Sequence, residues 1–168
     1  MALYDFTIVL GRPLTDEDYD AIFEAGLDDS APGVSNGRGY IAVSRESDRL
    51  LTAITTALRD VASAGLTAVS IRDEDMVTLT QIAERTGRTH ESVRLLATSK
   101  RGPGGFPAPI SDGKPSLYSW AEVADWFADA LGVAVQPHDA DARLLTAANY
   151  MLRARAIAPN EFEFLATA

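Results

Sequence analysis

The chain has 168 residues with 24 acidic and 15 basic side chains, a formal net charge of −9 at pH 7, and 46% hydrophobic residues. This hydrophobic share excludes disorder over most of the length, and no apolar run reaches the roughly 18–20 residues of a membrane span. The absence of cysteine excludes disulfides and thiolate chemistry. Because residues 1–10 lack a basic start and an apolar core, we expect no signal peptide, a cytoplasmic location and no membrane partner.

The charge is distributed unevenly along the chain. Residues 1–75 contain 14 acidic side chains and 6 arginines, a net charge of −8, whereas residues 76–131 contain 6 of each sign. Residues 132–168 carry a net charge of −1. Between positions 85 and 101, five basic side chains accompany a single acidic one, Glu91. Because salt-dependent binding to phosphate responds to local charge, the overall acidity does not exclude a nucleic-acid partner.

The first 75 residues begin with a strand pattern and a helix pattern. Residues 4–10 alternate between apolar and polar side chains, which predicts a half-buried strand. Thr15 precedes three acidic residues, which favours a helix N-terminus, and Gly26 is suited to end that helix. Asn36 and Gly37 mark the sharpest turn, and residues 40–44 are predicted to form another strand.

A second helix and a last strand complete this part of the chain. Ser47 is the predicted cap of a helix whose apolar residues recur at helical spacing, and residues 66–72 are predicted as a strand. If a short strand precedes Asn36, the order is β-α-β-β-α-β, which defines an α+β fold of the ferredoxin-like type over residues 1–75. That strand is the weak point, because Pro32 and Gly33 disfavour a strand start.

From Val77 the pattern changes to short helices separated by tight turns, so a domain boundary is predicted at residues 73–76. The second domain covers residues 76–131, and its last helix begins at Ser119. Residues 132–168 are predicted to form a C-terminal helical extension, with a helix that starts near Asp139 or Asp141. This helix carries an apolar stripe of Leu144, Leu145, Ala148, Met151 and Leu152. The stripe fits dimerisation and packing against its own domain equally well.

The spacing of residues 79–97 fits two short helices that cross at a steep angle. Such helices need a small residue where they touch, supplied by Ala83, and a turn residue that tolerates positive φ, supplied by Gly87. Thr89 is suited to cap the second helix. The inward face of that second helix is predicted to consist of Val93, Leu96 and Ala97.

Residues 77–130 resemble the MerR/excisionase-type winged helix-turn-helix of small bacterial regulators and recombination directionality factors. The similarity comprises residues 82–89, 93–96, 106–109 and 117–120, with Val123 and Trp126 after them. The sequence departs from the family at Thr86, where an aliphatic residue is more usual, and in the longer glycine-rich approach of residues 102–105. The resemblance implies a protein that binds double-stranded DNA and performs no catalysis.

In a helix-turn-helix, the N-terminal residues of the second helix face base edges in the major groove. The predicted base contacts are Thr89, His90, Glu91, Ser92 and Arg94. Arg94 is the leading base reader, since a guanidinium binds guanine O6 and N7 together, and Glu91 is suited to accept from cytosine N4. The predicted phosphate contacts are Arg88, Lys100, Arg101 and Lys114, the last at a wing tip over residues 111–114. Solvated surface roles for Arg94 and Lys114 fit the same pattern.

Catalytic and metal-binding patterns are not found in the sequence. The acidic residues 16–20 sit at a helix start, where solvated carboxylates are expected, and the glycine-containing turns lack the endings of phosphate-binding loops. His90 and His138 lie in different contexts and no cysteine accompanies them, which supports neither a zinc site nor a catalytic triad. We therefore expect no enzymatic activity, no cofactor and no metal.

The acidic residues 1–75 have three possible roles, between which the sequence does not choose. They are suited to bind a basic protein, to sense a small effector, or to form a homodimer that places two recognition helices on half-sites about 34–36 Å apart. The sequence thus predicts a transcriptional regulator. The alternatives are a DNA-binding antitoxin that neutralises a basic toxin through residues 1–75, and a protein-interaction adaptor.

Overall fold

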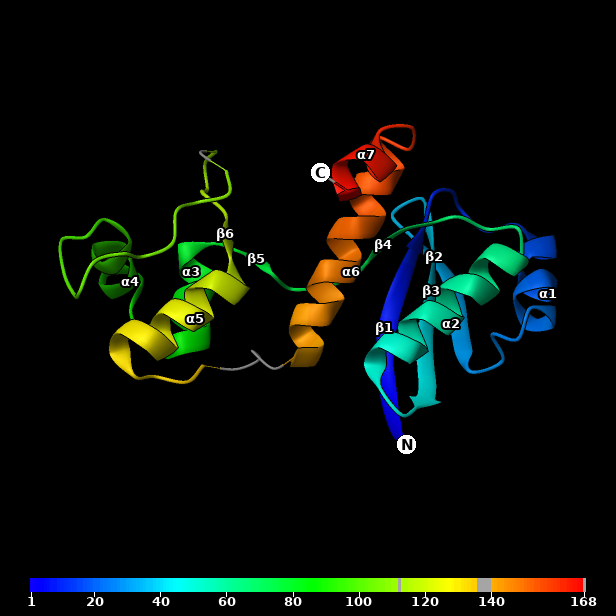
Figure 1. Ribbon diagram of the computed structural model, residues 1–168, viewed down its shortest axis with the longest axis horizontal. Coiled ribbons are helices and arrows are strands. Elements are labelled where there is room, and N and C mark those ends of the chain that lie inside the picture. The colour runs from blue at the N-terminus through cyan, green and yellow to red at the C-terminus, as the bar shows by residue number, and fades with distance from the viewer. Residues whose placement is uncertain (112, 136–139, 168) are drawn as a thin grey trace. The chain divides into compact units, whose positions relative to one another are not determined.

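The computed structural model describes residues 1–111, 113–135 and 140–167 (Figure 1). Within these residues the protein is a mixed α+β structure with seven helices, a four-stranded sheet and a two-stranded sheet. The chain forms two compact units, one of Met1–Asp73 with Leu144–Ala168 and the other of Glu74–Arg143. None of the described helices has both the length and the apolar character needed to span a membrane.

The first unit is built on an antiparallel sheet with the strand order β2-β3-β1-β4. Its strands are β1 (Ala2–Leu10), β2 (Ser30–Ser35), β3 (Arg38–Ser47) and β4 (Ala68–Ile71). Helix α1 (Asp16–Glu24) connects β1 to β2, and α2 (Leu50–Ser63) connects β3 to β4. The strand before Asn36 is therefore present. It accommodates Pro32 because β2 lies at the sheet edge and pairs with β3 alone.

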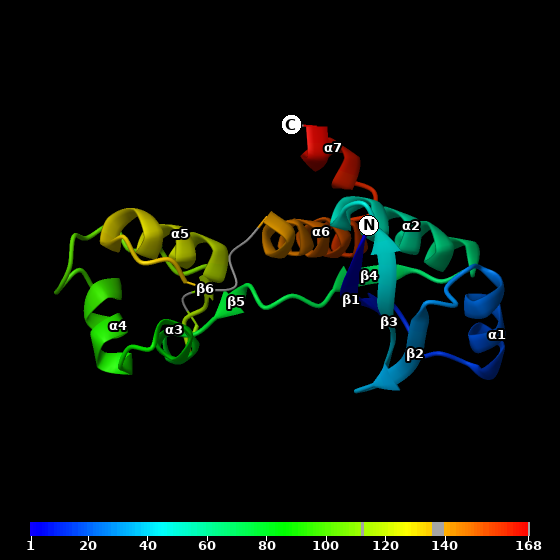
Figure 2. The same cartoon turned by 90° about the horizontal axis from the view of Figure 1, so that it is seen from below.

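One face of this sheet is covered by α1 and α2 (Figure 2). Phe6, Ile8 and Leu10 alternate along β1 and pack with buried residues of both helices, which accounts for the apolar–polar alternation. Ser47 does not cap α2 as predicted. It remains paired with Ala2 at the end of β3, so the helix starts later, with Arg49 as its N-cap.

Helix α6 (Ala140–Ile157) packs against the first unit from Leu144 onward, instead of standing with residues 132–143 as a separate extension. Four of the five stripe residues contact the core of this unit, and only Met151 is largely exposed. The buried Asn149 accepts a hydrogen bond from the Ile71 backbone N–H at 3.2 Å. Because β4 is an edge strand, Asn149 satisfies a donor that no neighbouring strand reaches. Of the two predicted starts of α6, Asp139 lies outside the described residues.

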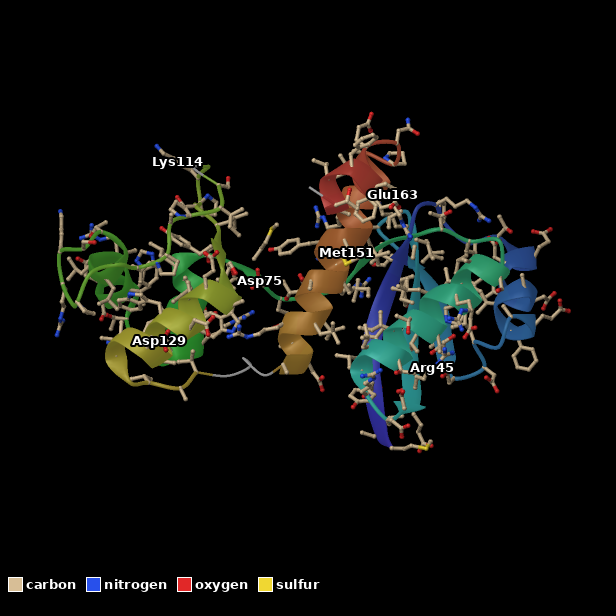
Figure 3. All side chains as sticks on the ribbon, in the orientation of Figure 1. Arg45, Asp75, Lys114, Asp129, Met151 and Glu163 are labelled. Carbon is tan, nitrogen blue, oxygen red and sulfur yellow. The ribbon has the colours of Figure 1, made fainter. Side chains whose placement is uncertain are left out.

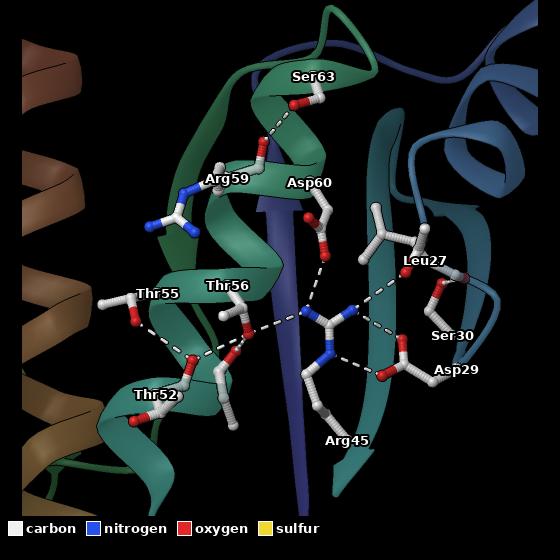
Figure 4. Close-up of polar contacts among 12 residues, drawn as sticks. Leu27, Asp29, Ser30, Arg45, Thr52, Thr55, Thr56, Arg59, Asp60 and Ser63 are labelled. Carbon is white, nitrogen blue, oxygen red and sulfur yellow. Dashed lines mark hydrogen bonds and ion pairs between the residues drawn. The ribbon is translucent and has the colours of Figure 1, made fainter. Parts of the chain in front are cut away.

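A network around Arg45 joins the α1–β2 connection to α2 across β3 (Figure 4). Arg45 Nε and Nη2 donate to the two Asp29 carboxylate oxygens at 2.6 and 3.0 Å, and Nη1 donates to Asp60 Oδ2 at 2.8 Å. Thr56 Oγ1 accepts a further bond from Nη1 at 3.0 Å. The hydrogen bonds to Asp29, and then the one to Asp60, raise the pKa of Arg45 above its ordinary value.

We expect Arg45→Met to lower the free energy of unfolding by about 2 kcal/mol, between the values for exposed and for fully buried ion pairs. The substitution would leave the side chains of Asp29 and Asp60, only 29% and 26% exposed, without their cation. Urea unfolding followed by circular dichroism measures the change. Arg59→Met on the exposed side of α2 is the matched control. Equal stability losses in both variants would contradict the prediction.

The second unit combines a short two-stranded sheet with three helices. Strands β5 (Met76–Val77) and β6 (Tyr118–Ser119) pair antiparallel, with Val77 opposite Tyr118. The helices are α3 (Leu79–Thr86), α4 (His90–Ala97) and α5 (Trp120–Leu131). As predicted, Ser119 caps α5, and its Oγ accepts from the Glu122 backbone N–H at 3.3 Å. In the described part of the chain, the two remaining elements are α6 and α7 (Phe162–Thr167) of the first unit; α7 was not predicted.

Asp75 fastens the beginning of the second unit to α5. Its buried carboxylate accepts hydrogen bonds from Ser119 Oγ at 3.1 Å and from the Ala121 backbone N–H at 2.8 Å. Its backbone carbonyl accepts from the Trp120 N–H at 2.7 Å. Asp75 thus stabilises the N-terminus of α5 together with Ser119, where a negative charge also interacts favourably with the helix dipole.

Candidate nucleic-acid interface

Two short helices, α3 and α4, are joined by residues 87–89 and lie at a steep angle to each other (Figures 1 and 2). Gly87 ends α3 in the left-handed conformation with φ of 64°, a backbone geometry that side chains other than glycine adopt at a cost. Ala83 is buried in the core of this unit. Gly87 thus occupies the turn between the two helices, as predicted, and the small Ala83 is buried.

The two sides of α4 differ in burial. Val93 and Leu96 are buried with Ile82 in the core of the second unit, while His90 and Glu91 are exposed and the Arg94 side chain is 41% exposed. Thr89 is exposed as well, and its Oγ1 caps the helix by accepting from the Ser92 N–H at 3.1 Å. A hydroxyl that accepts in this way retains its proton for donation to a ligand. Of the five predicted base-contact residues, Thr89 is thus the N-cap of α4 and the other four lie in the helix itself, with Ser92 and Arg94 partly buried.

Glu91 and Arg94 form a two-point ion pair on the exposed side of α4. Arg94 Nε donates to Glu91 Oε2 at 2.7 Å and Nη2 donates to Oε1 at 2.6 Å. These hydrogen bonds lower the pKa of Glu91 and raise the pKa of Arg94. The carboxylate occupies one edge of the planar guanidinium, so the N–H groups of Nη1 and the second N–H of Nη2 stay unoccupied by Glu91. The prediction that Glu91 binds cytosine did not include this partner.

The predicted phosphate-binding residues lie at both ends of α4 and in the loop that follows. Arg88 is exposed, and its guanidinium carbon lies 5.4 Å from the centroid of the Phe127 ring. Lys100 and Arg101 are exposed immediately after α4, where their backbone N–H groups both donate to the Leu95 carbonyl. Lys114 projects from the tip of its loop (Figure 3). All four cations are accessible to a ligand.

Arg85 differs from the other basic residues of this segment. Its guanidinium carbon lies 4.9 Å from the centroid of the Trp120 ring, and Nη2 forms an ion pair with Glu74 at 3.2 Å. These contacts hold Arg85 against its own unit. It counts toward the local charge of the sequence, but its geometry gives it a structural role.

The loop between α4 and β6 is attached to α5 and returns through a short hairpin. Trp126 Nε1 donates to the Gly104 carbonyl at 3.0 Å, and the Phe106 ring packs edge-on against the rings of Trp126 and Tyr118. Gly102 has φ of 83°, and a Cβ there would lie 2.7 Å from Leu96 Cδ2. At the first position of the glycine-rich approach, the positive φ and the adjacent Leu96 side chain therefore favour glycine.

The predicted wing tip follows this connection. Ser111 and Leu117 form an isolated antiparallel bridge, and the Ile110 N–H donates to the Leu117 carbonyl at 2.7 Å. The chain therefore reverses direction around residues 113–115. Asp112 of the predicted tip lies outside the described residues, and Gly113 and Lys114 beside it are exposed.

The described residues contain no group of three or more histidine, cysteine, aspartate or glutamate side chains placed to hold a metal ion. His138 lies outside the described residues. Sequence reasoning missed Asp75, because the residues that it contacts stand more than forty positions later in the chain. The acid alone gives no local signal of its role.

Neither a family model, nor a curated protein, nor a solved structure matches this chain.

Proposed function

We propose that the protein is a sequence-specific DNA-binding transcriptional regulator without catalytic activity, and that residues 76–131 are a winged helix-turn-helix of the MerR/excisionase type. The observation that supports this proposal is the two-sided character of α4. Its inner side is buried through Val93 and Leu96, while Thr89, His90 and Glu91 are exposed. In this proposal α4 enters the major groove, and the cations at its two ends contact the phosphates that flank the groove.

We also propose that the first unit is a ferredoxin-like domain. Its element order β-α-β-β-α-β and its antiparallel sheet support this proposal. A regulator with one recognition helix per chain reads a longer site when it dimerises, since two chains then occupy half-sites about 34–36 Å apart. A homodimer is therefore part of the proposal. The stripe of α6 does not supply its interface, because most of that stripe packs within its own chain.

Within this proposal, Arg94 reads guanine while Glu91 holds it in place. A guanidinium binds O6 and N7 of guanine through two N–H groups that point the same way. The side-on contact with Glu91 uses Nε and one proton of Nη2, and it leaves the end-on pair of Nη1 and Nη2 protons for the base. The ion pair thus fixes the rotamer that presents this edge, which reduces the conformational entropy lost on binding.

Arg94→Ala and Lys100→Ala are expected to affect DNA binding differently. A target duplex is first selected with the wild-type protein from a random library, and affinities are then measured by fluorescence anisotropy. Arg94→Ala should weaken binding to the selected duplex by about 5- to 150-fold, equivalent to about 1–3 kcal/mol, and change binding to random duplex little. Lys100→Ala should weaken both alike and reduce the slope of log affinity against log salt by about 1.

Two outcomes of this titration would count against the proposal. Equal effects of both substitutions on selected and random duplex would contradict the division into base and phosphate contacts. Absence of any salt-dependent binding to duplex DNA would remove the proposed function itself. Urea unfolding of each variant is the control for folding, since both side chains lie on the surface and their removal should leave stability nearly unchanged.

Glu91→Gln should change affinity and specificity in opposite directions. Loss of one negative charge from the DNA-facing surface should strengthen binding to random duplex, whereas a loosened Arg94 should lower the preference for guanine by about 2- to 10-fold. The preference is measured by competition with duplexes that carry each base pair in turn. Glu84→Gln on α3 removes an exposed acid and is the matched control, expected to keep the guanine preference. If the preference lost in Glu91→Gln is for a cytosine instead, Glu91 itself reads the base.

An antitoxin function is the second candidate, favoured by the acidic surface of α1. Asp16, Glu17, Asp20 and Glu24 are all exposed on this helix, and such a surface complements a basic protein. If this function holds, the protein should form a salt-sensitive complex with a small basic protein encoded beside it. Changing the four acids to amides should weaken that complex at least tenfold in calorimetric titration while DNA binding persists. An unaltered affinity would contradict the role of α1.

A further inference from the structure

Three helices of the first unit enclose an apolar groove of about 230 Å³. Leu51 and Leu58 of α2 line one side, Ala147 and Met151 of α6 line the other, and Phe162 of α7 contributes to the wall. The floor includes Ile54 and Leu152, which belong to the buried core of this unit. At the rim, Leu51 is 44% and Met151 is 61% exposed. The groove therefore leaves apolar surface in contact with water. A bound apolar group would remove this surface from water, which is favourable.

Among the described residues that line this groove, one is charged, Arg155 of α6. Arg155 forms no ion pair with any described residue. Arg12, Arg45 and Arg143, in contrast, each contact an aspartate. The one polar hydroxyl of the lining, Thr55 Oγ1, donates to the Leu51 carbonyl within α2. An apolar hollow with one unpaired cation at its edge matches a ligand with an apolar body and one anionic end.

We propose that this groove binds a small amphiphilic carboxylic acid, with its apolar chain between α2, α6 and α7 and its carboxylate on Arg155. Arginine binds a carboxylate through two parallel hydrogen bonds, which are stronger than neutral ones. Ligand sites are typically apolar hollows with a few polar groups that fix orientation. The volume lies below the 300–1,000 Å³ of pockets for drug-sized ligands, which favours a short or medium-length chain. This inference does not depend on the proposed DNA binding.

Isothermal titration calorimetry of the 168-residue chain with octanoate, at concentrations below those at which octanoate forms micelles, tests the proposal. Octanol has the same chain without the charge, and octyltrimethylammonium has the opposite charge. Octanoate should bind at one site per chain and at least tenfold more tightly than either comparison compound, because each of these lacks the charged hydrogen bonds to Arg155. Equal affinity for octanoate and octyltrimethylammonium, or no binding of octanoate, would overturn the proposal.

Three variants separate the charge from the apolar walls. Arg155→Gln should weaken octanoate binding about tenfold and leave octanol binding unchanged, whereas Ala147→Leu should abolish both by filling the groove. Arg153→Gln is the matched control, because Arg153 lies on the same helix but outside this groove. Unchanged octanoate binding by Ala147→Leu would overturn the proposal. A second copy of the chain in the groove would also overturn the proposal. In that case the wild-type protein would be a dimer in sedimentation velocity, Ala147→Leu would make it a monomer, and octanoate would not bind.

Discussion

Burial of one side of α4 determines which side chains the helix exposes on its other side. Val93 and Leu96 lie in the core of the second unit, and removing each such side chain from water contributes about 1.5–3 kcal/mol. A helix of eight residues is not stable alone in water, so this burial both forms α4 and fixes its rotation about its axis. The directions of His90, Glu91 and Arg94 follow from that rotation, and so does the set of side chains that α4 exposes to a ligand.

The surroundings of α4 are held by contacts between residues far apart in the sequence. Asp75 reaches the N-terminus of α5 through Ser119 and Ala121, and Trp126 fixes the loop after α4 through the Gly104 carbonyl. Both contacts satisfy buried or partly buried polar groups that would otherwise lose hydrogen bonds to water. They therefore attach the start and the long loop of the unit to the same helix, α5, which contributes Trp120, Trp126 and Phe127 to the core.

Local patterns in the sequence predicted the helices, turns and caps better than the contacts between elements that are distant in the sequence. Gly87, Thr89 and Ser119 act at the turn and caps where the spacing put them, because these roles depend on backbone geometry within a few residues. Ser47 failed as a cap because pairing with Ala2 keeps it in the sheet. The apolar stripe of α6 was predicted from its helical spacing, but the surface on which it packs was not. The hydrogen bond from the Ile71 N–H to Asn149 joins residues that no local rule connects. Likewise, the sequence shows the charge of Arg85 but not its contact with the Trp120 ring.

In the proposed DNA-binding role, the ion pair between Glu91 and Arg94 separates specific from non-specific contacts within residues 76–131, whose acidic and basic side chains are equal in number. Glu91 neutralises Arg94 within the same helix turn, so Arg94 adds little to the general attraction for phosphate, which depends on uncompensated charge. That attraction then rests on Arg88, Lys100, Arg101 and Lys114, all exposed around α4 or on the following loop. The proposed recognition of a base and the proposed attraction to the backbone thereby fall to different side chains. A low net charge limits non-specific affinity, and the ratio of specific to non-specific binding, which decides occupancy of a single site in a genome, rises accordingly.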